Sequence, residues 1–229
     1  MNISNASFSG TRFFACQNPL KQGGSRRGLP QSFLNRFIQV YVTSLTDADL
    51  HLILKNQFPN LCPELLEKML KFNSRVHAEL ANHSFGNKGS PWEFNLRDLT
   101  RWCEAMIYHY KVNPSDDRVY QPECLVHLIY GDRMRTLNDK TKINEIFEEV
   151  FGRKISGDAA IFYVNNEKVF IGDASLHRND CGIDANVISE EKSCLVLRSQ
   201  LPLLRSLAYC VNLNWMSLLV SCVEKMGNP

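Results

Sequence analysis

The chain has 229 residues and a formal net charge of +2 at pH 7, and 44% of its residues are hydrophobic and 22% charged. This composition is typical of a soluble globular protein that can bury a core without disulfides or a structural metal. A net charge so close to zero argues against a protein whose main task is electrostatic binding to nucleic acid or to a membrane surface.

The cysteines and the N-terminus predict an intracellular protein. No two of the eight cysteines form a C-x-x-C pair, and none stands at zinc-ligand spacing from a histidine. We therefore expect reduced, buried thiols and no metal site. The first residues lack the basic start and long apolar region of a signal peptide, and no apolar run approaches the ~18 residues of a membrane span. No membrane partner is expected.

The first 43 residues have the alternation of an α/β unit. An apolar strand is predicted over Phe13–Cys16 and ends at Gln17, Asn18 and Pro19. A glycine- and arginine-rich loop follows, then a short helix over residues 30–35 and a second strand over Ile38–Val42. Because a parallel sheet needs more strands than these two, we expect upstream sequence to supply the others.

Residues 44–150 have helical periodicity throughout. Thr46 is the predicted N-cap of the first helix, whose first turn contains acidic residues favoured by the helix dipole. A second helix begins at Pro63, Asn95 caps a third, and two more follow through residues 125–129 and 143–150. Helices joined by short loops predict a small bundle.

The remaining residues change in character. A hairpin is predicted for residues 160–172, with two alternating apolar strands around the turn at 165–167. Residues 173–191 are polar and predict a mobile linker. An amphipathic helix over 201–211 and an apolar run over 215–220 close the chain.

Asn18 follows a predicted strand, at the edge where open α/β sheets bind ligands. A neutral amide there can orient an attacking water or hydrogen-bond a γ-phosphate oxygen. The simpler interpretation is that Gln17, Asn18 and Pro19 form a turn.

Arg36 follows a helix whose apolar side chains hold it in place. A guanidinium fixed in this way can stabilise charge on a phosphoryl group that belongs to a neighbouring subunit or module. The alternative is a surface salt bridge.

Arg97 stands in the first turn of the third helix, just after Asn95. A cation there opposes the helix dipole, which costs up to ~1 kcal/mol unless an anion compensates it. This placement predicts a phosphate partner, or else an ion pair with Asp98 or Glu93.

Arg26 and Arg27, between glycines, could bind phosphate or RNA. Two arginines in a loop are more often solvated, and the nearly neutral chain agrees with that, so direct RNA binding is not the favoured interpretation.

Taken in order, these segments resemble the midasin family of AAA+ ATPases, which are very large dynein-like proteins with six AAA+ modules in one chain. The resemblance rests on ACQNP, the Gly/Arg loop, GLPQSFLNRF and the following strand, with FNLRDLTRW in support. It implies an α/β plus all-α fold. Residues 1–43 would be the C-terminal half of a AAA+ P-loop NTPase core, 44–150 its helical lid, 151–194 a β-hairpin and linker, and 195–229 the start of the next module.

The resemblance also implies roles for three residues. Asn18 matches the sensor-1 position, Arg36 the arginine finger that acts in trans, and Arg97 fits the sensor-2 position of the lid. The parent protein would bind ATP and Mg²⁺ and use hydrolysis to remodel pre-60S ribosomal particles and release assembly factors in the nucleus, in the nucleolus and nucleoplasm. The expected partners are neighbouring AAA+ modules of the same chain, pre-60S particles and assembly factors.

The sequence departs from the family pattern after Leu219-Val220, where the family continues into its phosphate-binding loop. The 229 residues contain no G-x-x-x-x-G-K-[ST] motif and no apolar run that ends in Asp-Glu. We therefore expect a fragment that binds no cofactor and is inactive alone. The alternative is a non-enzymatic protein-interaction module or scaffold.

Overall fold

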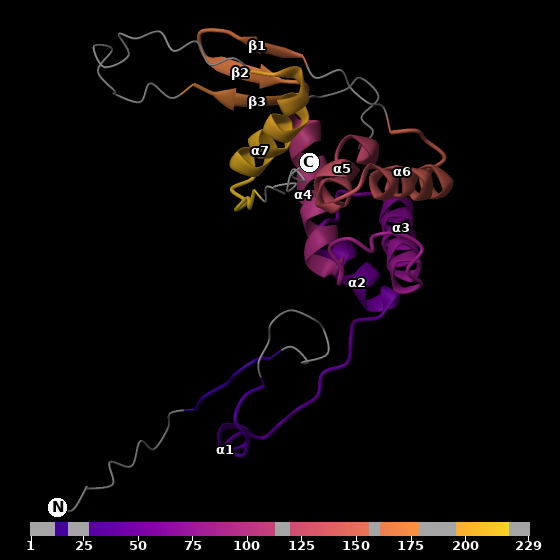
Figure 1. Cartoon of the computed structure of the whole chain (residues 1–229), viewed down its shortest axis with the longest axis vertical. Helices are drawn as coiled ribbons and strands as arrows, with labels where there is room; N and C mark the ends of the chain where they lie inside the picture. Colours follow the sequence, from indigo (N-terminus) through magenta and orange to yellow (C-terminus); the bar gives the residue numbers. More distant parts are fainter. Residues whose placement is uncertain (1–11, 18–27, 113–119, 156–160, 179–195, 220–229) are drawn as a thin grey trace, which may run out of the picture. The chain divides into compact units, whose positions relative to one another are not determined.

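The computed structural model describes residues 12–17, 28–112, 120–155, 161–178 and 196–219 (Figure 1). The chain divides into two compact units, Met1–Ser44 and Leu45–Pro229. Among the helices of the described ranges, none is long and apolar enough to cross a membrane.

The first unit contains one short helix, α1 (Gln31–Leu34). Neither predicted strand is present: Phe13–Cys16 and Ile38–Val42 have no regular secondary structure, and their large side chains are exposed, with Ile38 at 94%. A β-strand is held by backbone hydrogen bonds to a neighbouring strand. The described part of this unit offers no such neighbour, so the apolar patterns are left without a sheet.

The second unit begins with the helical bundle. Its long helices are α2 (Asp47–Gln57), α3 (Pro63–Ala81), α4 (Leu96–Val112) and α6 (Leu137–Phe151). The predicted fourth helix is only α5 (Val126–Ile129), flanked by 3₁₀ turns at Pro122–Cys124 and Gly131–Arg133.

The predicted start of the first long helix is confirmed. The Thr46 hydroxyl accepts a hydrogen bond from the Asp49 N–H, and the Asp49 carboxylate accepts one from the Thr46 N–H at 2.9 Å. This reciprocal pair satisfies two donors at the N-terminus of α2. The two hydrogen bonds from Thr46 also lower the pKa of Asp49.

The bundle closes on a cluster of aromatic rings. Phe72 of α3 makes edge-to-face contacts with Trp102, Tyr130 and Phe147, at centroid distances of 5.0 to 5.9 Å. All four side chains are fully buried. The Tyr130 hydroxyl donates to Asn73 Oδ1 at 2.9 Å and the Trp102 indole to the Pro122 carbonyl at 3.4 Å, so both polar groups of this cluster are satisfied.

An antiparallel sheet follows the bundle, in the order β1 (Phe162–Val164), β2 (Lys168–Ile171) and β3 (Ala174–His177). β1 and β2 confirm the predicted hairpin. In its turn, Asn165 Oδ1 accepts hydrogen bonds from the N–H groups of Glu167 and Lys168.

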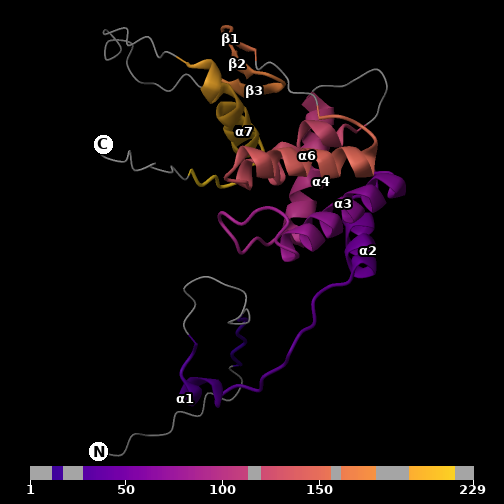
Figure 2. The ribbon, with the colours of Figure 1, turned by 45° about the vertical axis from the view of Figure 1, so that its right-hand side comes forward.

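β3 corrects the prediction of a linker over 173–191, because residues 174–177 form a strand. Ala174 pairs with Ile171 and both are buried. The last helix, α7 (Leu201–Asn212), is preceded by a 3₁₀ turn at Arg198–Gln200 and packs against β2 and β3 (Figures 1 and 2).

The expectation of buried thiols holds only in part. Cys103 is buried, and burial raises the pKa of its thiol to about 12. Cys210 is half-buried, whereas Cys16 and Cys62 are exposed. All four are free thiols.

Candidate functional site

Two of the three predicted site residues can be placed. Asn18 lies outside the described residues, as do Arg26 and Arg27, so their roles stay predictions. Arg36 follows α1 and is exposed, and its backbone N–H donates to the Phe33 carbonyl at 3.1 Å. Among the described residues its guanidinium has no partner, so the salt bridge considered for it is not formed there.

Arg97 is the second residue of α4, and its backbone N–H is held by a helix cap. Asn95 Oδ1 accepts a hydrogen bond from the Arg97 N–H at 3.0 Å, and the Asn95 N–H donates to Asp98 Oδ2 at 3.0 Å. The predicted capping role of Asn95 is therefore confirmed. The Arg97 side chain itself is exposed.

The acid at the start of α4, Asp98, is paired with Arg133 and not with Arg97. Its Nη1 donates to Asp98 Oδ1 at 3.1 Å and its Nη2 to the Glu93 carbonyl at 2.9 Å. Its guanidinium also lies 4.3 Å from the centroid of the Phe94 ring. Because Asp98 is already paired, Arg97 is left without a partner in the described part of the chain.

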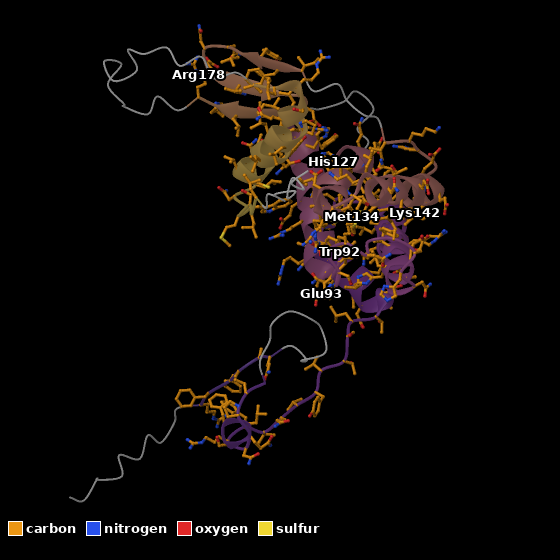
Figure 3. The ribbon with its side chains drawn as sticks, viewed as in Figure 1. Trp92, Glu93, His127, Met134, Lys142 and Arg178 are labelled. Atoms are coloured by element: carbon orange, nitrogen blue, oxygen red, sulfur yellow. The ribbon has the colours of Figure 1, made fainter. Side chains whose placement is uncertain are left out.

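The loop of residues 83–95 lies at the same end of the bundle, where Figure 3 shows Trp92 and Glu93. The Trp92 indole donates to the Gly86 carbonyl at 2.6 Å, and the Gly86 N–H donates to the buried Asp139 Oδ1 at 2.8 Å. Gly86 and Gly89 have φ of +72° and +102°. This left-handed backbone favours glycine, and a Cβ at Gly86 would also lie 2.5 Å from Leu80 Cδ2, so that side chain would have to shift.

A depression of about 390 Å³ borders this loop and the start of α6. The residues that line it include Phe85 and the charged side chains of Lys88, Asp139 and Lys142. Lys142 is paired with Glu145 at 3.3 Å and with Glu79 at 3.7 Å, and the hydrogen bond to Glu145 raises its pKa. These acids offset the charge of Lys142, so this lysine is not free to bind a phosphate.

A second polar cluster joins the bundle to the sheet and α7. Asp173, in the turn between β2 and β3, accepts a hydrogen bond from His109 Nε2 of α4 at 3.0 Å. Arg205 of α7 binds the same carboxylate through two nitrogens, with Nη2 2.7 Å from Oδ2. The side chains of His109 and Arg205 are each 11% exposed.

The charges of this cluster are fixed by its geometry. Burial opposes ionisation of Asp173, but hydrogen bonds from His109 and Arg205 and the charge of Arg205 outweigh it and hold the pKa of Asp173 well below its usual range. Burial, helped by the charge of Arg205, lowers the pKa of the neighbouring His127. Asp173 is therefore a carboxylate and Arg205 a paired cation at neutral pH.

Comparison of the sequence with known proteins identifies relatives of this chain. Residues 49–154, which span the bundle, match the family model of the midasin AAA lid domain. The chain is 36% identical over 231 residues to the midasin of Dictyostelium discoideum, an alignment that covers 91% of this chain and 4% of the relative. The chain belongs to the midasin family. The midasin of Giardia intestinalis is 30% identical over 226 residues, covering 93% of this chain and 5% of that relative.

Family membership identifies the bundle as a midasin lid and confirms the resemblance stated from the sequence. The chain spans only 4% and 5% of the length of these two midasins. The helical lid and the small antiparallel sheet agree with the expected mixture of helix and sheet, whereas the expected half of a AAA+ core is not formed by the described residues.

Sequence reasoning missed the cluster around Asp173. The sequence places Asp173 in a predicted linker and gives His109 and Arg205 no functional role. The separations are 64 residues from His109 to Asp173 and 32 from Asp173 to Arg205, so no local motif connects them. The signal that was present is a short alternating segment after Gly172, which could have been read as a third strand.

Proposed function

We propose that this chain is part of a midasin-type AAA+ ATPase, in which it forms the lid of one module and contributes residues to ATP sites completed elsewhere. The observation that carries the proposal is Arg97, an exposed and unpartnered cation among the described residues, at the capped start of a helix in a midasin lid. A guanidinium held on a rigid helix and not used by a neighbouring acid is suited to an oxyanion.

Each candidate residue has a proposed role. Arg97 would act as sensor 2 and bind phosphate oxygens when the lid closes. Arg36 would act as the arginine finger for the nucleotide of an adjacent module, and Asn18 as sensor 1. The exposed and unpartnered side chain of Arg36 within the described residues supports a role in trans, because a finger must reach beyond its own unit.

The described residues do not fit Mg²⁺-ATP as a complete site. They contain no group of three or more His, Cys, Asp or Glu side chains that could hold a metal ion. They do supply free guanidinium groups, whose task in phosphoryl transfer is to stabilise negative charge on the phosphates. ATP and Mg²⁺ would be held by other parts of the parent protein.

The parent protein would use ATP hydrolysis to remodel pre-60S ribosomal particles and release assembly factors in the nucleus. Neighbouring AAA+ modules of the same chain are the expected direct partners of Arg36.

The direct test is Arg36→Ala in the full-length protein, with ATP turnover as the measurement. We expect turnover at the affected site to fall about 10³-fold or more, because a finger stabilises the transition-state charge. Arg12→Ala is the matched control, since Arg12 is another exposed arginine of the same unit. Turnover that is unchanged in Arg36→Ala, or reduced equally in Arg12→Ala, would sink the assigned role.

A second candidate function is a non-enzymatic interaction module. It is favoured by the lack of a phosphate-loop motif in the 229 residues. Titrating the 229-residue chain with a fluorescent ATP analogue separates two cases. Micromolar binding would contradict the view that the site is completed elsewhere. No binding by this chain, together with full ATPase activity of the Arg36→Ala protein, would favour the interaction module.

A further inference from the structure

The sheet and α7 meet the lid bundle through one carboxylate. Asp173 lies at the tip between β2 and β3, and Gly172 before it has φ of +62°. That backbone turns the carboxylate toward both α4 and α7, where it is bound by His109 and Arg205. Three elements that are distant in sequence therefore share one acceptor group.

This junction fixes position in a way that apolar contacts alone do not. Apolar burial is roughly proportional to area and has no direction. The guanidinium fork of Arg205 fits a carboxylate in one planar geometry, with two parallel hydrogen bonds. A shift of α7 by one turn would leave a buried cation and a buried anion unpaired, which is strongly unfavourable.

Further hydrogen bonds join α7 and the residues after it to the sheet and to the bundle. Ser206 of α7 donates to Asp132 at 2.8 Å, and Asn212 donates to the Ser175 carbonyl of β3 at 2.8 Å. Just past α7, the Trp215 indole donates to Glu104 of α4 at 3.2 Å. Helix α7 is thus bound to the sheet on one side and to the bundle on the other.

We propose that His109, Asp173 and Arg205 form an all-or-none latch that docks β1–β3 and α7 on the lid as one body. Asp173 is its positioning residue. With the three groups paired, the sheet and α7 hold one orientation against α4. Without them, both elements leave the bundle together while its aromatic core stays closed. None of the three latch residues is a proposed nucleotide-site residue, so the latch goes beyond the proposed function and can fail independently of it.

Hydrogen exchange of the whole 229-residue chain, followed by mass spectrometry, tests the latch. In Asp173→Asn we expect the opening constants of β2, β3 and α7 to rise together by about 100-fold, because one partner of a buried ion pair is lost. The amides of α3 and α6 should keep their protection, since their core does not include Asp173. If Asp173 instead stabilised the whole second unit as one cooperative fold, hydrogen exchange would rise equally in all of its helices.

Asp139→Asn is the matched control, because Asp139 is also a buried carboxylate of the second unit but binds the Gly86 N–H. It should loosen residues 83–95 and leave α7 protected. If Asp173→Asn does not fold, Arg205→Lys keeps the charge and removes the fork, and about a 10-fold rise confined to the sheet and α7 is expected. Unchanged exchange in α7, separate opening of sheet and helix, or equal loss in α3 would overturn the latch.

Discussion

The N-terminal segment and the helical bundle both carry many large apolar side chains, yet only the bundle buries them. Phe14 and Ile38 in the first unit are 90% and 94% exposed, whereas Phe72 and Trp102 in the second are fully buried. A helix satisfies its own backbone and needs only a neighbouring helix to cover its apolar face. A strand needs a neighbour for its backbone as well, so the lid can be completed by local sequence and the strand segments cannot.

The largest effect that would test this contrast is removal of an aromatic side chain from the bundle core. We expect Trp102→Ala to lower the free energy of unfolding by about 3–5 kcal/mol, because it leaves a cavity beside Phe72 and Tyr130. Urea titration followed by circular dichroism measures this. A loss below about 1 kcal/mol would mean that the bundle core is not what holds the second unit together.

Lowering the pH should reduce the stability of the fold by a smaller amount. This effect distinguishes the Asp173 junction, which titrates, from the apolar bundle core, which does not. The folded pKa of Asp173 is depressed, so its contribution is present above the unfolded pKa and is lost as the pH falls below about 4. His127 also has a lowered pKa, so its share of acid destabilisation begins nearer pH 6.5.

Urea titrations of the wild-type and Asp173→Asn chains between pH 7 and pH 3 separate these two contributions. The stability difference between the chains should be constant from pH 7 to about 5 and should shrink below pH 4. A difference that stays constant down to pH 3 would show that Asp173 is not a depressed carboxylate.

The smallest effect is expected in the first unit. Ile38→Ser removes a large apolar side chain that makes no buried contact, so the free energy of unfolding should change by less than about 0.5 kcal/mol. Leu54→Ser, a fully buried position of α2, is the matched comparison and should cost several times more. Equal losses in the two variants would mean that Ile38 is buried in solution.

Local signals predicted the lid well. The side chains of Thr46 and Asn95 mark helix starts because they replace missing backbone partners within three residues, which the sequence displays directly. The hairpin turn at Asn165 is a local signal of the same kind, because its side chain accepts a hydrogen bond from the Lys168 N–H three residues further on. The family resemblance rested on short phrases of sequence, and the comparisons confirm it.

What the sequence did not predict depends on distant residues. Whether Phe13–Cys16 forms a strand is decided by a neighbouring strand, and whether Arg97 pairs with Asp98 is decided by Arg133, 35 residues beyond Asp98. The Asp173 junction combines a strand turn with two helices in the same way. Such convergences have no periodicity or spacing from which they could be read.

The two glycines of the 83–95 loop have a consequence for how midasin lids can diverge. Exposed loops usually accept substitutions more readily than cores do. Here the order should be reversed, because a side chain at Gly86 or Gly89 meets Leu80, Trp92 or Arg135 and also demands a left-handed backbone. A buried leucine can exchange with methionine for less than about 1.5 kcal/mol. Across related lids, the buried Gly86 and the half-buried Gly89 should therefore vary less than the buried leucines of the bundle.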